Sequence, residues 1–170
     1  MADDEPQAGH AGLTHVDATG AARMVDVSGK NVTVRTASAR GRVELTAAAY
    51  ALVADGGLPK GDALGVARIA GIMAAKRTPD LVPLCHPIGL TGVEVEVDCL
   101  DGVVRIVALV RTRDRTGVEM EALTAVAVAG LAVLDMVKGV DPTARLTDVE
   151  VTAKTGGVHG DWSRPGAGAA

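Results

Sequence analysis

Hydrophobic and polar residues alternate most clearly in the middle of the chain. Valines alternate with acidic residues from 93 to 98, Asp101-Gly102 interrupts the pattern, and apolar alternation resumes over Val103–Arg113. Period-two alternation on both sides of an Asp-Gly pair is typical of a β-hairpin. Shorter alternating stretches predict three further strands, at Met24–Val27, Asn31–Thr36 and Arg145–Thr155.

Two shorter helices are predicted between the first strands and the hairpin. The first covers Ala47–Ala54, with Thr46 before it as a candidate N-cap. The second begins after Asp62, another N-cap candidate, and continues to Arg77, where positive charge suits a helix C-terminus.

A longer helix is predicted over Gly117–Gly139, after the hairpin. It is rich in Ala, Val and Leu, and Thr116 with Glu119 has the spacing of a capping box. Its last turn carries Asp135 and Lys138, three residues apart and therefore on one face.

The order strand, helices, strand, strand, helix, strand predicts an α+β fold: a ferredoxin-like antiparallel sheet with helices packed on one face. In the return strand of the hairpin, Ile106, Ala108 and Val110 point to one face, while Val107 and Leu109 point to the other. Because both faces carry apolar residues, we expect another subunit to cover the second face. The sequence therefore predicts a homo-oligomer.

The length of 170 residues and a hydrophobic content of 48% fit one domain with a proper core. Hydrophobic periodicity is absent from 1–12 and from 161–170, so both are predicted to be loose tails of a 13–160 domain. A net charge of −4 with no Phe, one Tyr and one Trp argues against a nucleic-acid partner.

A membrane partner is not expected either. The longest uncharged apolar stretch, Ala122–Leu134, is shorter than the roughly 18 residues that span a bilayer. The N-terminus is acidic and has no apolar run like that of a secretory signal. Two cysteines without disulfide-framework spacing fit a reducing compartment, so we predict a cytoplasmic protein.

The pair Asp135 and Lys138 is the first candidate for chemistry. A carboxylate at a helix C-terminus faces the negative end of the macrodipole, so stability alone explains Lys138 better than Asp135. A solvated surface ion pair is the alternative interpretation.

Pro83-Leu84-Cys85-His86-Pro87 is a second candidate, because a proline at each end stiffens the loop. The alternative is a buried thiol beside an imidazole that satisfies a backbone carbonyl. A zinc site is not predicted, because Cys99 has no histidine near it and too few ligands are available.

Two lysines are candidates for anion binding. Lys60 directly precedes the helix that begins after Asp62, where free amide groups favour anions, although it could equally be a solvated loop lysine. Lys154 precedes Gly156-Gly157, whose backbone N–H groups could converge on an anion.

Taken together, these residues resemble the molybdenum cofactor biosynthesis protein C family. The resemblance extends from about Leu13 to Gly160, and its ordered blocks are more specific together than any one alone. In chain order they are Leu13–Asp17, Met24–Val27, Lys60–Asp62, Ala67–Ile72, Ala74–Thr78, Pro83–Pro87, Thr116–Thr124 and Asp135–Lys138.

The resemblance implies a ferredoxin-like subunit in a homohexamer built as a trimer of dimers, with the active site at a subunit interface. It implies a lyase that converts 3′,8-cyclo-7,8-dihydro-GTP, a cyclised dihydro-GTP, to cyclic pyranopterin monophosphate and pyrophosphate. That reaction needs proton transfers and anion stabilisation but no redox cofactor. Mg²⁺ could accompany the triphosphate, although the sequence assigns no ligands to it.

Residue by residue, the resemblance implies catalytic roles for Asp135, Lys138 and Lys60. It also implies substrate contacts from the positions Leu84, Cys85, His86, Met120 and Glu121, and Lys154 could hold the triphosphate. If Asp135 and Lys60 meet across a subunit interface, mixed oligomers of their variants should regain activity.

One departure and two rival functions remain. Relatives often continue Gly-Gly-Lys where this chain has Gly156-Gly157-Val158-His159, which puts a phosphate contact there in doubt. The rivals are a non-catalytic anion-binding regulatory module and a scaffold for the upstream radical enzyme. Asp135 discriminates against a simple anion binder, because a carboxylate beside the lysine would repel the ligand.

Overall fold

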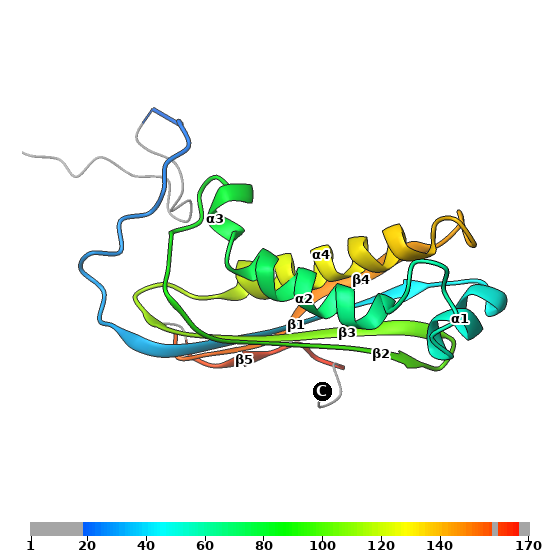
Figure 1. The fold of residues 1–170 in the computed structure, drawn as a ribbon. Helices are drawn as coiled ribbons and strands as arrows, with labels where there is room; N and C mark the ends of the chain where they lie inside the picture. The colour runs from blue at the N-terminus through cyan, green and yellow to red at the C-terminus, as the bar shows by residue number, and fades with distance from the viewer. Residues whose placement is uncertain (1–18, 158–159, 167–170) are drawn as a thin grey trace, which may run out of the picture.

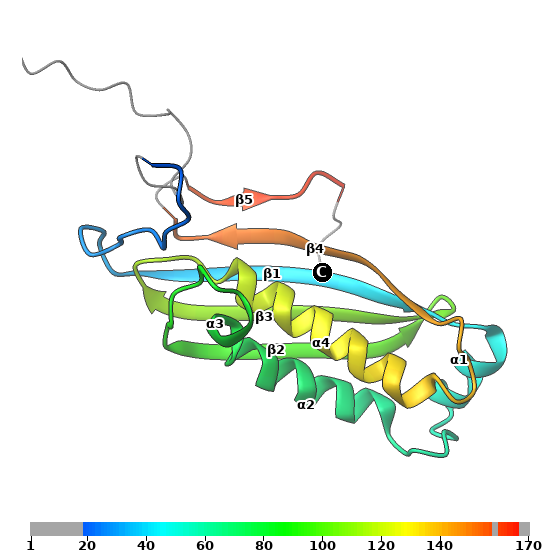
Figure 2. The ribbon, with the colours of Figure 1, turned by 90° about the horizontal axis from the view of Figure 1, so that it is seen from above.

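One antiparallel sheet forms the base of the molecule, with α2 and α4 lying side by side across one of its faces (Figures 1 and 2). The computed structural model describes residues 19–157 and 160–166. The sheet has five strands in the order β2-β3-β1-β4-β5. The predicted α+β class, an antiparallel sheet with helices packed against it, is confirmed.

Most of the predicted elements are present, some with different bounds. In chain order the elements of the structure are β1 (Thr33–Glu44), α1 (Ala47–Ala54), α2 (Ala63–Ala75), α3 (Thr78–Leu81), β2 (Leu90–Leu100), β3 (Val103–Asp114), α4 (Glu119–Val137), β4 (Arg145–Thr155) and β5 (Trp162–Ser163). The sequence predicted neither α3 nor β5.

Local sequence signals explain the hairpin and the helix starts. Asp101 and Gly102 both have positive φ angles, +50° and +82°, as the tight turn between β2 and β3 requires. Thr46 and Asp62 cap α1 and α2 as predicted, since each side chain accepts a backbone N–H three residues further on.

Strand β1 is twice as long as the predicted Asn31–Thr36 strand, because it continues through small residues to Glu44. Ala37, Ala39 and Gly41 form its core-facing side and lie beneath α4. A Cβ at Gly41 would be 2.7 Å from Cγ1 of Val126, so only glycine lets the helix approach this closely.

The two long helices are equally close to each other. A Cβ at Gly71 of α2 would be 2.9 Å from the carbonyl oxygen of Ala125 and 3.3 Å from Cβ of Ala129 in α4. Small residues at the crossing therefore replace large aromatic rings, of which the chain has only Tyr50 and Trp162. Burial of the surrounding valines, leucines and alanines provides the hydrophobic stabilisation of the domain.

Helix α4 is the central element of this core. By length and composition it alone among the described helices could cross a bilayer, but ten of its residues are buried within the domain. The predicted capping box is wrong: Val118 is the N-cap, and no side chain caps the helix. Glu119 instead pairs with Lys154 of β4, at 3.0 Å.

Both ends of the domain and the segment before β1 differ from the sequence prediction or lie outside the described residues. Met24–Val27 is not a strand but part of an irregular segment that leads into β1. The C-terminal tail predicted from residue 161 is wrong for Trp162–Ser163, because they form β5 and pair with β4. The predicted N-terminal tail, 1–12, lies outside the described residues.

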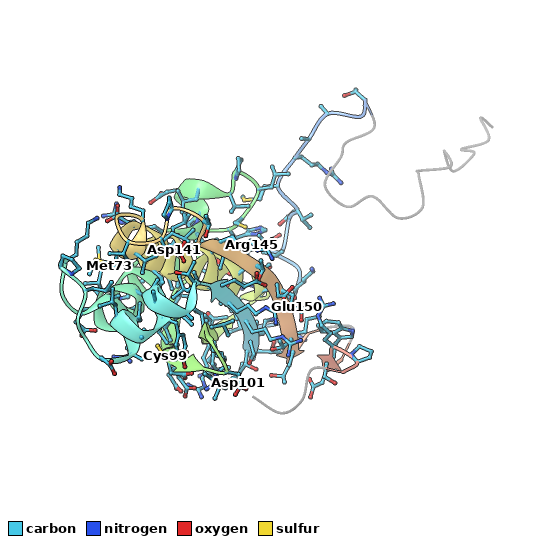
Figure 3. All side chains as sticks on the ribbon, turned by 90° about the vertical axis from the view of Figure 1, so that its right-hand side faces the viewer. Met73, Cys99, Asp101, Asp141, Arg145 and Glu150 are labelled. Carbon is cyan, nitrogen blue, oxygen red and sulfur yellow. The ribbon has the colours of Figure 1, made fainter. Side chains whose placement is uncertain are left out.

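Asp141 ties the end of α4 to the start of α1. Its carboxylate is buried and accepts N–H groups from Thr46 at 2.6 Å and Thr143 at 3.0 Å, and also the Thr143 hydroxyl at 2.7 Å. These hydrogen bonds lower the pKa of Asp141 to about 2. Figure 3 shows Asp141 at this end of the molecule, near Arg145 at the start of β4.

The crossing of α2 and α4 generates a stability prediction. We expect Gly71→Ala to lower the free energy of unfolding by about 1–3 kcal/mol, because the added methyl overpacks the crossing. Alanine's higher helix propensity, about 1 kcal/mol, only partly offsets this. Urea denaturation measures the change. Gly139→Ala is the matched control, because no atom lies within 4 Å of its added Cβ; equal stability of both variants would contradict the packing argument.

Candidate active site

Asp135 lies between two lysines at the C-terminal end of α4. Its Oδ1 is 2.7 Å from Nζ of Lys138, and its Oδ2 is 2.9 Å from Nζ of Lys60. Lys60 also donates to the backbone carbonyl of Asp135, at 2.7 Å. The structure thus brings together the three residues predicted to be catalytic, and it does so within one chain.

The two lysines determine the charge state of this cluster. Hydrogen bonds and ion pairing with Lys138 and then Lys60 lower the pKa of Asp135 to about 2, so the carboxylate stays ionised at neutral pH. Two ammonium groups share one carboxylate and leave a net positive charge. Such a cluster can donate protons and attract an anion, and a plain structural ion pair needs only one of the lysines.

A pocket of about 460 Å³ opens at the other end of α4. It contains every side chain predicted to contact substrate except Lys154. It is lined by Val25, Val27, Lys30, Leu84, Cys85, His86, Ile88, Thr116, Gly117, Glu119, Met120 and Glu121.

His86 forms one wall of this pocket and anchors the N-terminal segment. Its Nε2 lies 2.7 Å from the carbonyl oxygen of Val25. Because a carbonyl can only accept, Nε2 carries the proton and donates it. The imidazole thus satisfies a backbone carbonyl, which is the alternative that the sequence left open. The same side chain also lines the pocket.

Glu121 is the buried acid of the pocket, with 3% of its surface exposed. Burial, with a smaller contribution from the charge of Glu119, raises its pKa to about 7. Burial and the charge of Glu121 also raise the pKa of the Cys85 thiol. At neutral pH Glu121 can therefore hold or release a proton, and Cys85 stays a neutral thiol.

A second, smaller pocket of about 100 Å³ adjoins the first and shares Lys30, Gly117 and Glu119 with it. Lys154 contributes a positive charge and is paired with Glu119. Arg35 is 7% exposed, and its Nε donates to the carbonyl of Asp114 at 3.1 Å. Three cations against one carboxylate suit an anionic ligand.

Lys30 and Arg35 line this pocket, and the sequence interpretation did not name them as candidates. Lys30 stands in a stretch without periodicity, so nothing marked it. Arg35 did carry a signal, because it occupies the core-facing side of β1 together with Ala37 and Ala39. A charged residue in a series of core positions indicates a buried functional or structural role.

The candidate residues thus form two groups at opposite ends of α4. With a rise of about 1.5 Å per residue, Glu121 and Asp135 are separated by roughly 21 Å along the helix axis. Figure 1 shows the start of α4 near α3 and its end near α1, on opposite sides of the molecule. Among the described residues no group of three or more His, Cys, Asp or Glu side chains could hold a metal ion.

The buried carboxyl of Glu121 predicts a pH effect on stability. Its pKa rises from 4.5 to about 7 on folding, so ionisation of the folded protein is penalised. We therefore expect stability to fall as the pH rises from about 4.5 to 7, and Glu121→Gln to remove this loss. Urea denaturation at pH 5 and pH 8 measures it, with Glu96→Gln, an exposed carboxylate, as control. An unchanged pH dependence in Glu121→Gln would contradict the assignment.

Comparison with known proteins agrees with the motif blocks. The model of the MoaC family matches residues 24–157. The cyclic pyranopterin monophosphate synthase of Streptomyces avermitilis is 63% identical over 152 residues, covering 89% of this chain and 89% of the relative. That of Nocardioides sp. is 63% identical, covering 90% and 96%. Cyclic pyranopterin monophosphate synthase 2 of Mycobacterium tuberculosis is 56% identical, covering 89% and 91%. The chain therefore belongs to the MoaC family.

Proposed function

We propose that this protein is a cyclic pyranopterin monophosphate synthase of molybdenum cofactor biosynthesis. It converts 3′,8-cyclo-7,8-dihydro-GTP to cyclic pyranopterin monophosphate and pyrophosphate. The relatives carry this name, and the observation that supports it best is the carboxylate of Asp135 held between Lys60 and Lys138.

The cluster at the end of α4 supplies the proton transfers. A purine-derived ring must open and reclose, and pyrophosphate must leave as the ribose phosphate cyclises. Lys138 and Lys60 offer ammonium protons to the nitrogen and oxygen atoms that gain electrons, and Asp135 fixes the direction of both Nζ atoms. The net positive charge of the cluster stabilises developing negative charge.

The larger pocket binds the base-derived part of the substrate. Leu84 and Met120 provide apolar contact, and Cys85, His86 and Glu121 provide polar groups at fixed positions. Because the pKa of Glu121 is about 7, it can present either a donor or an acceptor to the ring at neutral pH. The smaller pocket, with Lys154, Lys30 and Arg35, binds the phosphates.

The active site is composite, because a nucleotide cannot contact both ends of α4 in one chain. The large pocket of one subunit must then meet the Asp135 cluster of a neighbour. Lys60 and Asp135 contact each other within one chain. Complementation between variants of these two residues is therefore no longer expected. The useful pairing joins a variant of the cluster with a variant of the pocket.

The apolar surface supports a homo-oligomer, for which we propose the hexamer, a trimer of dimers, implied by the family. On the helix side Val66, Ile69, Met73 and Leu131 are exposed, each at 46% or more. The strand order β2-β3-β1-β4 and the paired crossover helices support the ferredoxin-like plan of each subunit. The domain start near residue 13, the cytoplasmic location, and the lack of a metal or redox cofactor remain parts of this proposal, and β5 extends the domain beyond residue 160.

The catalytic roles predict large losses of turnover. We expect Lys138→Ala and Asp135→Asn each to lower the single-turnover rate at least about a hundredfold, the usual scale for a lost general acid or base. Substrate affinity should survive better, and Asp135→Asn could tighten it by removing a negative charge. Incubation with the cyclised dihydro-GTP, with detection of pterin and pyrophosphate, measures the rate.

The same Asp135→Asn preparation provides the control. The side chain is 58% exposed, so its ion pairs are screened and the melting temperature should stay close to that of the parent. A folded variant with a near-normal rate would refute catalysis by Asp135. Neither an anion-binding module nor a scaffold would form pterin, even as the parent protein, and only the module would bind the nucleotide.

The composite site predicts complementation between subunits. Asp135→Asn and His86→Ala chains, each of low activity alone, should regain about a quarter to a half of the parental activity when they are mixed into one oligomer, because some sites then receive two intact halves. Mixing Asp135→Asn with Lys60→Ala should give no recovery, since both defects fall on the same half. Light scattering provides the mass of the oligomer. A monomer mass, or recovery in neither mixture, would contradict the arrangement.

A further inference from the structure

The segment that follows β4 folds back along it and is tightly held. Arg164 donates its N–H to the carbonyl of Thr152 at 2.7 Å, and its Nε to that of Val151 at 2.8 Å. Its guanidinium pairs with Glu150 at 3.2 Å and lies 5.6 Å from the ring centre of Trp162. These contacts fix β5 against β4, and they place Asp161 beside the turn that begins at Gly156.

Both backbone polar groups of Gly156 are hydrogen-bonded to side chains, one from nearby Asp161 and one from distant Thr33. Its N–H donates to Oδ1 of Asp161 at 3.0 Å, and its carbonyl accepts the hydroxyl of Thr33 at 3.0 Å. Its φ is +78°, and a Cβ here would overlap the carbonyl oxygen of Val34. The backbone is therefore pinned to β1 in a conformation that only glycine adopts without strain.

This pinned glycine borders the small basic pocket. Lys154 and Thr155 immediately precede it, Gly157 immediately follows it, and all three line the pocket together with Lys30 and Arg35. The position of Gly156 thus fixes where the strand end stands relative to the Arg35 guanidinium. None of the roles assigned above involves Asp161, which sequence periodicity placed in a tail.

We propose that Asp161 is a positioning residue for the phosphate pocket: by accepting the Gly156 N–H, it holds Lys154 and Gly157 where they can bind the phosphates of the substrate. The inference rests on the proposed function and deepens it. Thr33 holds the same glycine through its carbonyl group.

Electrostatics makes the proposal testable by sign. A carboxylate close to an anion pocket opposes anion binding by its charge. If charge were its only effect, removing Asp161 would tighten the binding of an anion. If it positions the strand end, loss of its acceptor oxygen weakens binding, and asparagine, which keeps a carbonyl oxygen, preserves it.

The experiment measures binding of inorganic pyrophosphate to the full-length protein by calorimetry. We expect Asp161→Ala to raise the Kd about tenfold, the scale of one well-placed hydrogen bond, and Asp161→Asn to stay within about twofold of the parent. Thr33→Val should weaken binding in the same direction. Asp101→Asn, a carboxylate at the β2–β3 turn, is the control for loss of surface charge.

Turnover provides the second readout. With the cyclised dihydro-GTP, Asp161→Ala should raise KM about tenfold and change kcat less than about threefold, with recovery in Asp161→Asn. Melting temperatures of the variants show whether each is folded. A general loss of structure would instead lower kcat. It would also weaken pyrophosphate binding equally in Asp161→Asn and Asp161→Ala.

Several results would overturn the proposal. If Asp161→Ala bound pyrophosphate as tightly as the parent or more tightly, Asp161 would act only through its charge and would have no positioning role. If the parent protein turned over substrate but did not bind pyrophosphate, the small pocket would not be the phosphate site. The proposed synthase activity would be unaffected by that result. If the variants changed the Kd for pyrophosphate as expected but the parent formed no pterin, the positioning role would be supported and the proposed activity refuted.

Discussion

Close packing of α4 on β1 and α2 determines where the candidate site residues lie. Gly41 and Gly71 provide the room, and a methyl group at either position would meet an atom of α4 within 3 Å. Because the helix is packed along nearly its whole length, it acts as a rigid rod with Glu121 near one end and Asp135 near the other. A small shift of the rod would displace both groups together.

The macrodipole of α4 favours an anionic ligand at its N-terminal end and the two lysines at its C-terminal end. The basic pocket, with Lys154 and Arg35, lies near the N-terminal end, where free N–H groups favour an anion. At the C-terminal end Lys60 donates to the carbonyl of Asp135, one of the carbonyls that the helix leaves without an internal partner. The unfavourable placement of a carboxylate there is offset by two lysines, and one of them comes from a loop remote in sequence.

Local signals allowed much of the fold to be predicted, whereas long-range ones were out of reach. The Asp101-Gly102 turn and the cap at Asp62 follow from backbone preferences of a few residues. The extension of β1 was missed, because its glycine and alanines are required by close packing against α4, which lies far along the chain. Lys60 and Asp135 were each suspected from their own surroundings, but their contact joins residues 75 positions apart. Strand β5 was missed because it has only two residues, too few to show a hydrophobic period, and because contacts of Arg164 with β4 hold it in place.

The exposure of the cluster of Lys60, Asp135 and Lys138 is itself a physical argument for a second subunit. In the single chain the side chains of Lys60, Asp135 and Lys138 are 44%, 58% and 67% exposed. Water at this exposure screens their charges, so the cluster alone would stabilise a developing charge only weakly. A neighbouring subunit that brings its large pocket over the cluster would exclude that water and strengthen the same interactions several-fold. Assembly would then complete the list of substrate contacts and also create the low-dielectric surroundings in which the two lysines can act.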